Sequence, residues 1–138
     1  MKKKTVASLK RRIVPIFSEY IRKRDCLRTT GSLEYGDCIS CNRASVPYHE
    51  LDAGHFIPKH NANLFSERGV HAQCIKCNRY QGGNQLEYRR QIVKLYGEGA
   101  DEELEAEARQ IKKFTIQELE ELEISLKERI KELENHGE

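Results

Sequence analysis

Two Cys-x2-Cys pairs constrain this chain more than any other sequence feature. The first pair is Cys38 and Cys41, the second is Cys74 and Cys77, and roughly thirty residues separate them. Each pair forms a tight turn that offers two thiolates to one side of a tetrahedral zinc ion. Four thiolates leave no position for water, so we expect a structural zinc, with any chemistry supplied by nearby polar residues. The alternative is that the cysteines are redox-active or core residues.

The organisation of the chain follows from its length and composition. With 138 residues, 38% of them hydrophobic and 33% charged, the chain has room for one domain with a small core that a metal would help to stabilise. We predict a single domain over residues 1–138. It consists of a basic helical arm (1–28), a zinc-bound core (29–98) and an acidic helical tail (99–138).

Cysteine usage and hydropathy indicate where such a chain works. Five cysteines without an apolar signal segment are typical of a reducing compartment, where paired cysteines bind metal rather than form disulfides. Cys26 lies outside both pairs and is expected to be a semi-buried thiol. No run of about 18 apolar residues is present, so no membrane-spanning segment is expected.

The charges of the chain are divided between its two parts. Residues 1–97 carry 18 Lys and Arg against 8 Asp and Glu, whereas residues 98–138 carry 6 against 14. A basic surface around a small zinc module indicates a polyanionic partner, most simply nucleic acid. The acidic tail is then expected either to face away from the nucleic acid or to shield the basic surface when none is bound.

Hydrophobic periodicity predicts the elements of a mixed α+β fold. A helix is expected over residues 5–25, with Pro15 either marking its start or kinking it. Strands are expected over 48–57 and 70–73, with a polar loop between them. Further helices are predicted over 85–96, from Asp101 as a cap to Lys113, and from a capping box of Thr115 and Glu118 to Asn135. The last helix packs within the monomer or forms a coiled-coil dimer.

His55 is the first candidate for chemistry. It lies at the end of the first predicted strand, beside the zinc-bound turns of a basic protein. Because the ordinary pKa of imidazole lies near neutrality, a histidine in that place can act as a general base. A lone histidine is more often structural, so its neighbours decide between the two roles.

Those neighbours carry a family resemblance that covers nearly the whole chain. The segments 18–22 (SEYIR), 52–58 (DAGHFIP) and 73–78 (QCIKCN) resemble the NinG, or Rap, recombination endonucleases of lambdoid phages. That family is similar in motif to His-Asn-His (HNH) endonucleases of the endonuclease VII type, which resolve branched DNA. The resemblance implies a small ββα-metal core with four-cysteine zinc knuckles, flanked by a basic N-terminal helix and two C-terminal helices.

The resemblance also implies roles for individual residues. His55 would activate water for attack on a phosphodiester, while Asn78 and Asp52 would hold a catalytic divalent cation, Mg²⁺ or Mn²⁺. Asn84 either completes that cation site or caps its helix. His71 is either a structural hydrogen-bond donor or a catalytic helper.

Two positions depart from the pattern of the family. The endonuclease VII type has its metal-binding aspartate directly before the histidine, where this chain has Gly54. Asp52 lies three residues before His55, so the two would share a site only if the strand bulges, which a glycine permits. Gly69 stands where an asparagine would orient the base, and His71 or a backbone carbonyl is the expected substitute.

Basic residues near both motifs are the candidates for contact with DNA phosphates. Lysine and arginine in such a density, with few opposing acids, are typical of a surface that neutralises a phosphate backbone. The candidates are Lys10, Arg11, Arg12, Arg22, Lys23, Arg24, Lys59, Lys76 and Arg79.

Three functions are compatible with these features. The first is an HNH-type endodeoxyribonuclease of phage recombination, which cuts branched or Holliday-junction DNA in the cytoplasm of an infected or lysogenic bacterial host. A homodimer is compatible with that activity, because a junction is cut on two strands. The second function is a non-catalytic zinc module that binds nucleic acid, and the third is a protein-interaction adapter that uses the acidic tail. The joint presence of Asp52, His55 and Asn78 favours the first, because a binding module needs none of them.

Overall fold

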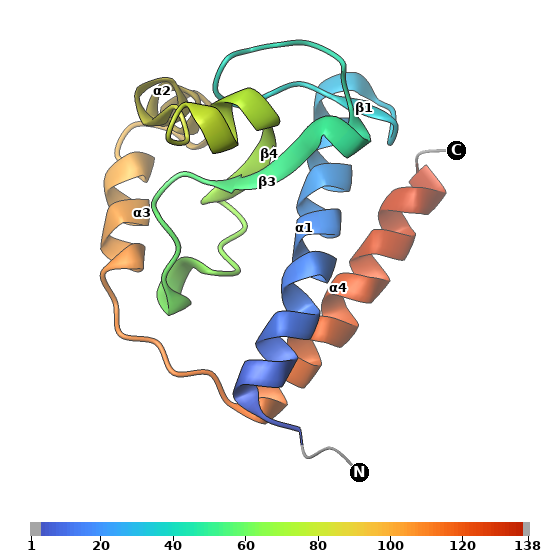
Figure 1. The fold of residues 1–138 in the computed structure, drawn as a ribbon, viewed down its shortest axis with the longest axis vertical. Helices are drawn as coiled ribbons and strands as arrows, with labels where there is room; N and C mark the ends of the chain where they lie inside the picture. Colours follow the sequence, from blue (N-terminus) through green and yellow to red (C-terminus); the bar gives the residue numbers. More distant parts are fainter. Residues whose placement is uncertain (1–3, 137–138) are drawn as a thin grey trace.

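A hairpin of two antiparallel strands lies between two pairs of helices in the computed structural model, which describes residues 4–136 (Figure 1). Helices α1 (Val6–Thr30) and α4 (Ile116–His136) pack side by side on one flank of the hairpin. Helices α2 (Gln85–Tyr96) and α3 (Ala100–Ala108) cover the other flank. The predicted mixed α+β class is confirmed. No helix within the described residues is both long and apolar enough to cross a membrane.

Helix α1 runs without interruption through Pro15, so the expectation that the helix starts at the proline is wrong. The helix is capped at Thr5, whose hydroxyl accepts a hydrogen bond from the backbone N–H of Ser8 (3.0 Å). The proline lies on the exposed side of the helix, where water can satisfy the carbonyl that loses its partner. The helix ends at Gly31, whose φ of 77° is the left-handed conformation that favours glycine.

Helices α1 and α4 form the largest apolar core of the described residues. Leu9, Ile13 and Phe17 of α1 are buried against Leu119 and Leu126 of α4. Ion pairs frame this core, and they join Lys4 to Glu120, Arg12 to Glu123 and Lys23 to Glu134. The acidic tail therefore pairs with part of the basic arm, and the last helix packs within the monomer, which was one of its two expected arrangements.

The hairpin consists of β3 (Leu51–His55) and β4 (Val70–Cys74) in unbroken antiparallel register. Leu51 pairs with Cys74 at one end and His55 with Val70 at the other. The predicted first strand is shortened because 48–50 form a 3₁₀ turn, and a second 3₁₀ turn interrupts the loop at 61–63. A small sheet of β1 (Tyr35–Gly36) and β2 (Val46–Pro47), which periodicity did not predict, closes the loop that carries the first cysteine pair.

Helices α2 and α3 form a second core with the hairpin end, where Phe56 packs against Tyr88, Ile92 and Leu104. The bounds of α2 agree with the prediction. The prediction for α3 is wrong at both ends, because Gly99 precedes the helix, Asp101 pairs with Arg89 instead of capping, and the helix stops at Ala108. The predicted capping box of α4 is confirmed by the Glu118 N–H to Thr115 Oγ1 bond of 3.1 Å.

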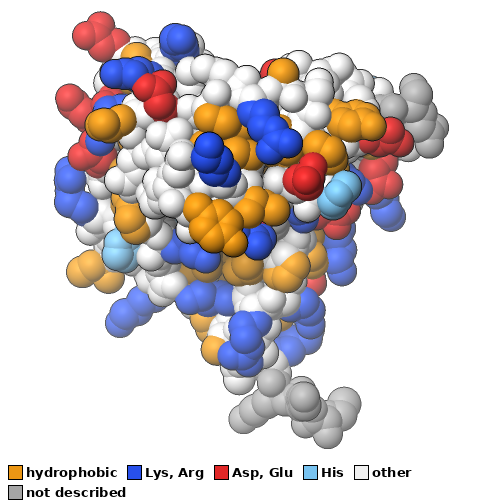
Figure 2. Space-filling model, turned by 45° about the horizontal axis from the view of Figure 1, so that its top comes forward, with side chains coloured by type: hydrophobic (Ala, Val, Ile, Leu, Met, Phe, Trp, Pro, Cys, Tyr) orange, Lys and Arg blue, Asp and Glu red, His pale blue; other side chains and the backbone are white. Residues whose placement is uncertain are grey.

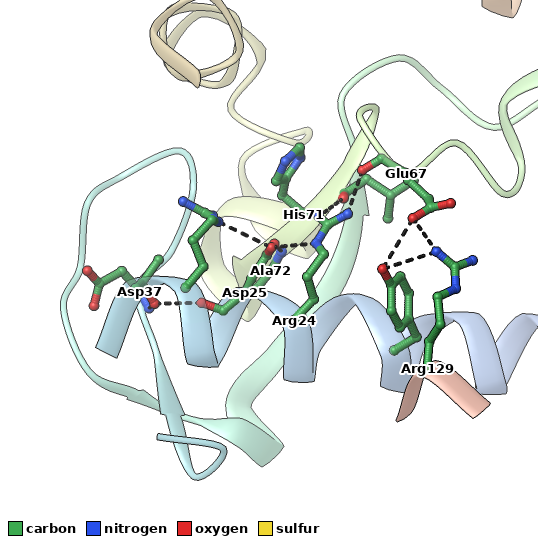
Figure 3. Close-up of polar contacts among 12 residues, drawn as sticks. Arg24, Asp25, Asp37, Glu67, His71, Ala72 and Arg129 are labelled. Carbon is green, nitrogen blue, oxygen red and sulfur yellow. Dashed lines mark hydrogen bonds and ion pairs between the residues drawn. The ribbon is translucent and has the colours of Figure 1, made fainter. Parts of the chain in front are cut away.

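A buried polar network joins α1 to β4 (Figure 3). Asp25 accepts from the Arg24 guanidinium (2.9 Å) and from the backbone N–H of Ala72 (2.8 Å). Arg24 also donates to the carbonyl oxygens of Glu67 (2.7 Å) and Val70 (2.9 Å). Because these groups are satisfied by one another, a charged pair is tolerated inside the protein and fixes the register of helix on strand.

His71 lies next to this network and is fully buried. The Tyr88 hydroxyl donates to the carbonyl of Gly54 (2.7 Å), so its 3.4 Å contact with His71 Nδ1 requires a ring N–H there. The neutral ring then accepts from the Tyr96 hydroxyl at Nε2 (2.7 Å). Burial lowers the pKa of His71 to about 3, against the attraction of Asp25.

We predict that this buried neutral imidazole makes folding stability fall in mild acid. Between pH 6.5 and the folded pKa of about 3, the unfolded chain binds a proton at His71 that the folded protein does not. The free energy of unfolding therefore decreases by about 1.4 kcal/mol for each pH unit below 6.5. Urea unfolding of His71→Gln should show a flatter pH dependence between pH 7 and 5.5. The exposed His49→Gln serves as control, and an equal slope in His71→Gln and wild type would contradict the assignment.

Candidate functional site

The four paired cysteines come together at one end of the hairpin. Their Sγ atoms lie within 4.8 Å of one another, and those of Cys41 and Cys74 are 3.7 Å apart. A tetrahedral site with Zn–S bonds of about 2.3 Å places its sulfurs about 3.8 Å apart, so the cluster fits a zinc ion. Cys38, Cys74 and Cys77 are buried and Cys41 is exposed. The structure thus supports a metal site here.

Hydrogen bonds orient these thiols before any metal binds. Cys38 Sγ accepts from the backbone N–H of Cys74 (3.3 Å) and contacts Ser40 Oγ (3.5 Å). Burial raises the pKa of the Cys38 thiol, but these hydrogen bonds outweigh it and lower that pKa to about 7. Asn84 donates its side-chain N–H to Cys77 Sγ (3.5 Å). The lowered pKa favours the thiolate form of Cys38, whereas burial raises the pKa of the Cys41 and Cys74 thiols.

Asn84 makes a contact that neither sequence expectation for that residue included. It stands at the N-cap position of α2, but its side chain makes no cap hydrogen bond, and its backbone adopts a left-handed conformation with φ of 46°. Its amide N–H is instead directed to the sulfur of Cys77, which it helps to orient.

Beside the sulfur cluster, a cavity of about 250 Å³ brings together the three residues that the sequence assigned to catalysis. Asp52 and His55 enter it from β3, and Asn78 enters it from a π-helical turn (Lys76–Tyr80) that contains Cys77. Val14, Phe17 and Ser18 of α1 form the opposite wall. The cysteine-bearing turn, the hairpin and the basic helix therefore converge on one site.

The His55 ring is held by main chain rather than by another side chain. Its Nε2 lies 3.2 Å from the carbonyl oxygen of Leu64, and since a carbonyl only accepts, Nε2 carries the proton. In that tautomer the lone pair of the neutral ring is on Nδ1. Burial lowers the pKa of His55 and Lys59 lowers it further, although the Leu64 contact opposes both. A backbone carbonyl thus takes the orienting place that Gly69 leaves vacant, while His71 is buried elsewhere.

Asp52 is engaged by two neighbours in the cavity wall. Its carboxylate accepts two hydrogen bonds from Arg79 (2.9 Å each) and one from the Asn78 amide (3.0 Å). Partial burial raises the pKa of Asp52, but these donors outweigh it and hold the pKa below its ordinary value. The carboxylate is therefore ionised and faces a guanidinium.

The bulge expected at Gly54 is wrong, because the strand register is regular through that residue. Asp52 and His55 nevertheless reach one cavity. Strand β3 pairs only with β4 in a two-stranded sheet, so its other edge has no partner strand in that sheet. Side chains from both faces of β3 reach the cavity at this outer edge. Alternation along a strand excludes a shared site only where the strand lies inside a wider sheet.

Gly54 has another role, which involves a residue that the sequence did not single out as functional. A Cβ at position 54 would lie 1.9 Å from Gln73 Oε1 and 3.1 Å from Asn78 Oδ1. Gln73 is fully buried and donates to Ser40 Oγ (2.9 Å) and to the carbonyl of Gly83 (2.7 Å). The Gln73 side chain passes over Gly54 and thus links the hairpin to the segments around both cysteine pairs. Its sequence signals were its place directly before the second cysteine pair and in the 73–78 segment of the family resemblance, and neither indicated this contact.

The predicted phosphate-binding residues fall into three groups. Arg12, Lys23 and Arg24 are engaged within the protein by Glu123, by Glu19 and Glu134, and by Asp25. Arg24 is directed inward, which removes it from the candidate phosphate contacts. Arg22 stacks on the Tyr48 ring at 4.4 Å and hydrogen-bonds to Ser18. The others lie in or around the cavities or on the exposed turn beside them, and they are Lys10, Arg11, Lys59, Lys76 and Arg79.

A second cavity of about 410 Å³ extends the first along α1. The two share Val14, Lys59 and Leu64, and the extension is bordered by Lys10 and Arg11. Figure 2 shows Lys and Arg side chains spread over the middle and lower part of one face, with acidic side chains mostly toward its edges. A continuous basic groove therefore leads away from His55.

Cys26 lies apart from both cavities, among Val46, Leu51 and Ala72. It is fully buried, not semi-buried as expected, and burial raises the pKa of its thiol to about 11. A buried thiol with that pKa is unreactive and serves as an apolar core residue.

Comparison with known proteins gives a consistent match. A family model described as "Bacteriophage Lambda NinG protein" matches residues 1–138. Protein ninG of Escherichia phage lambda is 31% identical over 100 residues, which cover 71% of this chain and 48% of that protein. Protein ninG of Salmonella phage P22 is 30% identical over 98 residues, covering 70% and 47%. The chain spans about half the length of the curated relatives it matches, and no solved structure matches it.

We predict that the fold depends on a metal bound by the four cysteines. A structural zinc site contributes on the order of 10 kcal/mol, comparable to the total stability of a domain. Cys77→Ser should therefore lose the metal and leave the hairpin and the cysteine-bearing segments unfolded, whereas Cys26→Ser should keep it. Elemental analysis with circular dichroism measures both effects, and well-folded wild-type protein without zinc would refute the prediction.

We also predict a strong coupling between Gly54 and Gln73. Gly54→Ala forces Gln73 off its partners, and such overpacking costs about 1–3 kcal/mol of stability. In a Gln73→Ala background the same change should cost much less, because the conflicting oxygen is gone. Denaturant unfolding of the two single variants and the double variant measures the coupling energy, and simple additivity would show that the close approach has no energetic role.

Proposed function

The chain belongs to the NinG family of bacteriophage proteins, and from this premise we propose that it is a metal-dependent endonuclease that hydrolyses phosphodiesters in branched DNA. One observation carries the proposal. His55, Asn78 and Asp52, which the HNH resemblance assigned to chemistry from three separate sequence positions, line a single cavity. The order of β3, β4 and α2 beside a four-cysteine cluster also agrees with the ββα-metal core that this resemblance implies.

His55 has the properties that a general base requires. Its lowered pKa keeps the ring neutral at pH 7, and the Leu64 carbonyl fixes the proton on Nε2, so Nδ1 can accept a proton from water. The ring is partly buried yet lines the cavity, which limits competing water while leaving room for a phosphate. On this proposal, His55 removes the proton of the attacking water.

Oxygen donors for a divalent cation lie next to this base. Asn78 Oδ1 is directed toward Gly54, and the ionised Asp52 carboxylate lies beside it, which is the donor chemistry that Mg²⁺ and Mn²⁺ prefer. When bound, such a cation neutralises charge on the phosphate and stabilises the leaving oxygen. Asn78 would hold it, while the zinc-binding cysteines would fix the turn that carries Asn78.

The basic groove supplies the path for DNA. Lys59 lies in both cavities, and Lys10 and Arg11 border the one farther from His55. Neither Arg11 nor Lys59 makes an ion pair within residues 4–136, so their charges remain free to bind phosphates flanking the scissile bond. On this proposal the protein acts on DNA in the cytoplasm of an infected bacterial host.

We predict that His55→Ala abolishes cleavage without affecting folding or DNA binding. General-base catalysis supplies about 10² to 10⁴ in rate. The assay uses linear, single-stranded and four-way-junction DNA with Mg²⁺, Mn²⁺ or chelator. Zinc content, circular dichroism and binding to the junction should remain as in wild type.

The matched control is His49→Ala, because His49 is an exposed histidine that lines neither the first cavity nor its extension. In wild type, the acidic limb of kcat/KM should lie below pH 6.5, because burial lowers the pKa of His55. Cleavage by His55→Ala at the wild-type rate would exclude His55 as the general base. Absence of metal-dependent cleavage by wild type would leave a zinc-containing DNA-binding module as the better description of the protein.

We predict that the free cations of the groove, and not the paired ones, determine the salt dependence of DNA binding. Replacing Arg11 and Lys59 by Gln should lower the slope of log Kd against log salt by about one for each phosphate that is no longer neutralised. Arg12→Gln is the matched control, since Arg12 already pairs with Glu123. Equal slopes for the groove variant and wild type would place the DNA on another surface.

A further inference from the structure

Arg79 forms an ion pair with Asp52, the carboxylate that the proposed reaction needs for its cation. Its Nε and Nη2 donate to the two oxygens of Asp52 at 2.9 Å each, and the Asn78 amide donates to one of them at 3.0 Å. The guanidinium thus places a positive charge directly against the oxygens that a divalent cation would approach. Asp52 cannot serve that cation well while this pair persists, because like charges repel at such distances.

The two partners differ in how freely they move. The Asp52 side chain is 18% exposed and is held by the Asn78 amide. The Arg79 side chain is 58% exposed, and it projects from the turn that contains Cys77. The guanidinium is therefore the member of the pair that can leave, and the carboxylate is the member that stays.

An incoming phosphate is the natural competitor for Arg79. Guanidinium binds phosphate through the same two-pronged geometry that it uses with a carboxylate. Arg79 lines the cavity together with His55 and Lys59, so a DNA phosphate that enters there comes within its reach. Transfer of the guanidinium to the phosphate leaves Asp52 ionised and without its counter-charge.

We propose that Arg79 is a positioning residue that exchanges Asp52 for a DNA phosphate, and that this exchange frees Asp52 to bind the divalent cation. The inference rests on the proposed function, because it concerns the cation of that site. Its consequence is that DNA and cation bind with positive coupling, each tightening the other by the same factor. The protein free of DNA then holds its cation weakly.

The test measures Mn²⁺ binding by electron paramagnetic resonance, using the zinc-loaded full chain in a His55→Ala background so that DNA is not cut. Without DNA, Arg79→Gln should bind Mn²⁺ about 1.5-fold to fivefold more tightly than the parent, as expected for release of one exposed ion pair. Adding a four-way junction should tighten Mn²⁺ binding by the parent and should have a smaller effect on Arg79→Gln. Arg79→Lys keeps the positive charge but loses the two-pronged geometry of the guanidinium. Its Mn²⁺ affinity should therefore lie between those of the parent and Arg79→Gln.

Arg68→Gln is the matched control. Arg68 forms an exposed pair with Glu103 (3.0 Å) outside both cavities, so this change also frees a carboxylate and removes one charge. It should leave Mn²⁺ affinity as in the parent. If Arg68→Gln raised the Mn²⁺ affinity as much as Arg79→Gln, the effect would be explained by net charge alone and the proposal would be overturned.

Two further outcomes separate this inference from the proposed function. Equal Mn²⁺ affinity of parent and Arg79→Gln without DNA, or unchanged Mn²⁺ affinity in Asp52→Asn with the junction bound, would overturn the exchange and leave a cation site built on Asn78. Absence of Mn²⁺ binding in every variant, with and without DNA, would overturn the metal-dependent reaction itself.

Discussion

The gathering of four cysteine side chains at one point is the constraint on which the rest of the structure depends. Cys74 ends β4 and Cys77 lies in the turn that follows, so a metal held there fixes both the hairpin and the direction of the next residues. Asn78 and Arg79 come directly after that anchor, and Gln73 comes directly before it. A metal site worth on the order of 10 kcal/mol outweighs each hydrogen bond of the cavity. The positions of Asn78 and Arg79 in the cavity are therefore determined mainly by their covalent proximity to Cys77.

Much of this arrangement could be predicted from the sequence, because its signals are local. The cysteine spacing, the periodicity of α1 and α4, and the pairing of Thr115 with Glu118 each involve residues close in sequence. Partners distant in sequence could not be predicted. Neither Asp25 with Ala72 nor Gln73 with Ser40 has a sequence pattern of its own, and each depends on how helix, strand and loop pack. The expected bulge was wrong for the same reason, since only the fold shows that the outer edge of β3 borders the cavity.

The charge division of the chain has two physical meanings that composition cannot separate. Part of the basic arm is a structural counterpart of the acidic tail, as the pairs of Arg12 with Glu123 and Lys23 with Glu134 show. Other cations, Arg11 of the arm and Lys59 of the loop, have no such counterpart within residues 4–136 and border the groove. Arg11 makes no ion pair within residues 4–136, whereas the next residue, Arg12, pairs with Glu123. A count of charges therefore overstates the basic surface that is free of internal ion pairs, and the packing of α1 on α4 determines which side of α1 keeps unpaired cations.

The contact between His55 and the carbonyl of Leu64 has a consequence for how the family can vary. A carbonyl belongs to every amino acid, so natural selection can replace the side chain at position 64 without altering the group that orients the imidazole. What must be preserved is the path of the main chain through the loop, and that path is set by Asn63, whose amide bonds to the carbonyls of Ile57 and Pro58. Divergent relatives can therefore retain the same ring orientation while differing at the residue that supplies it.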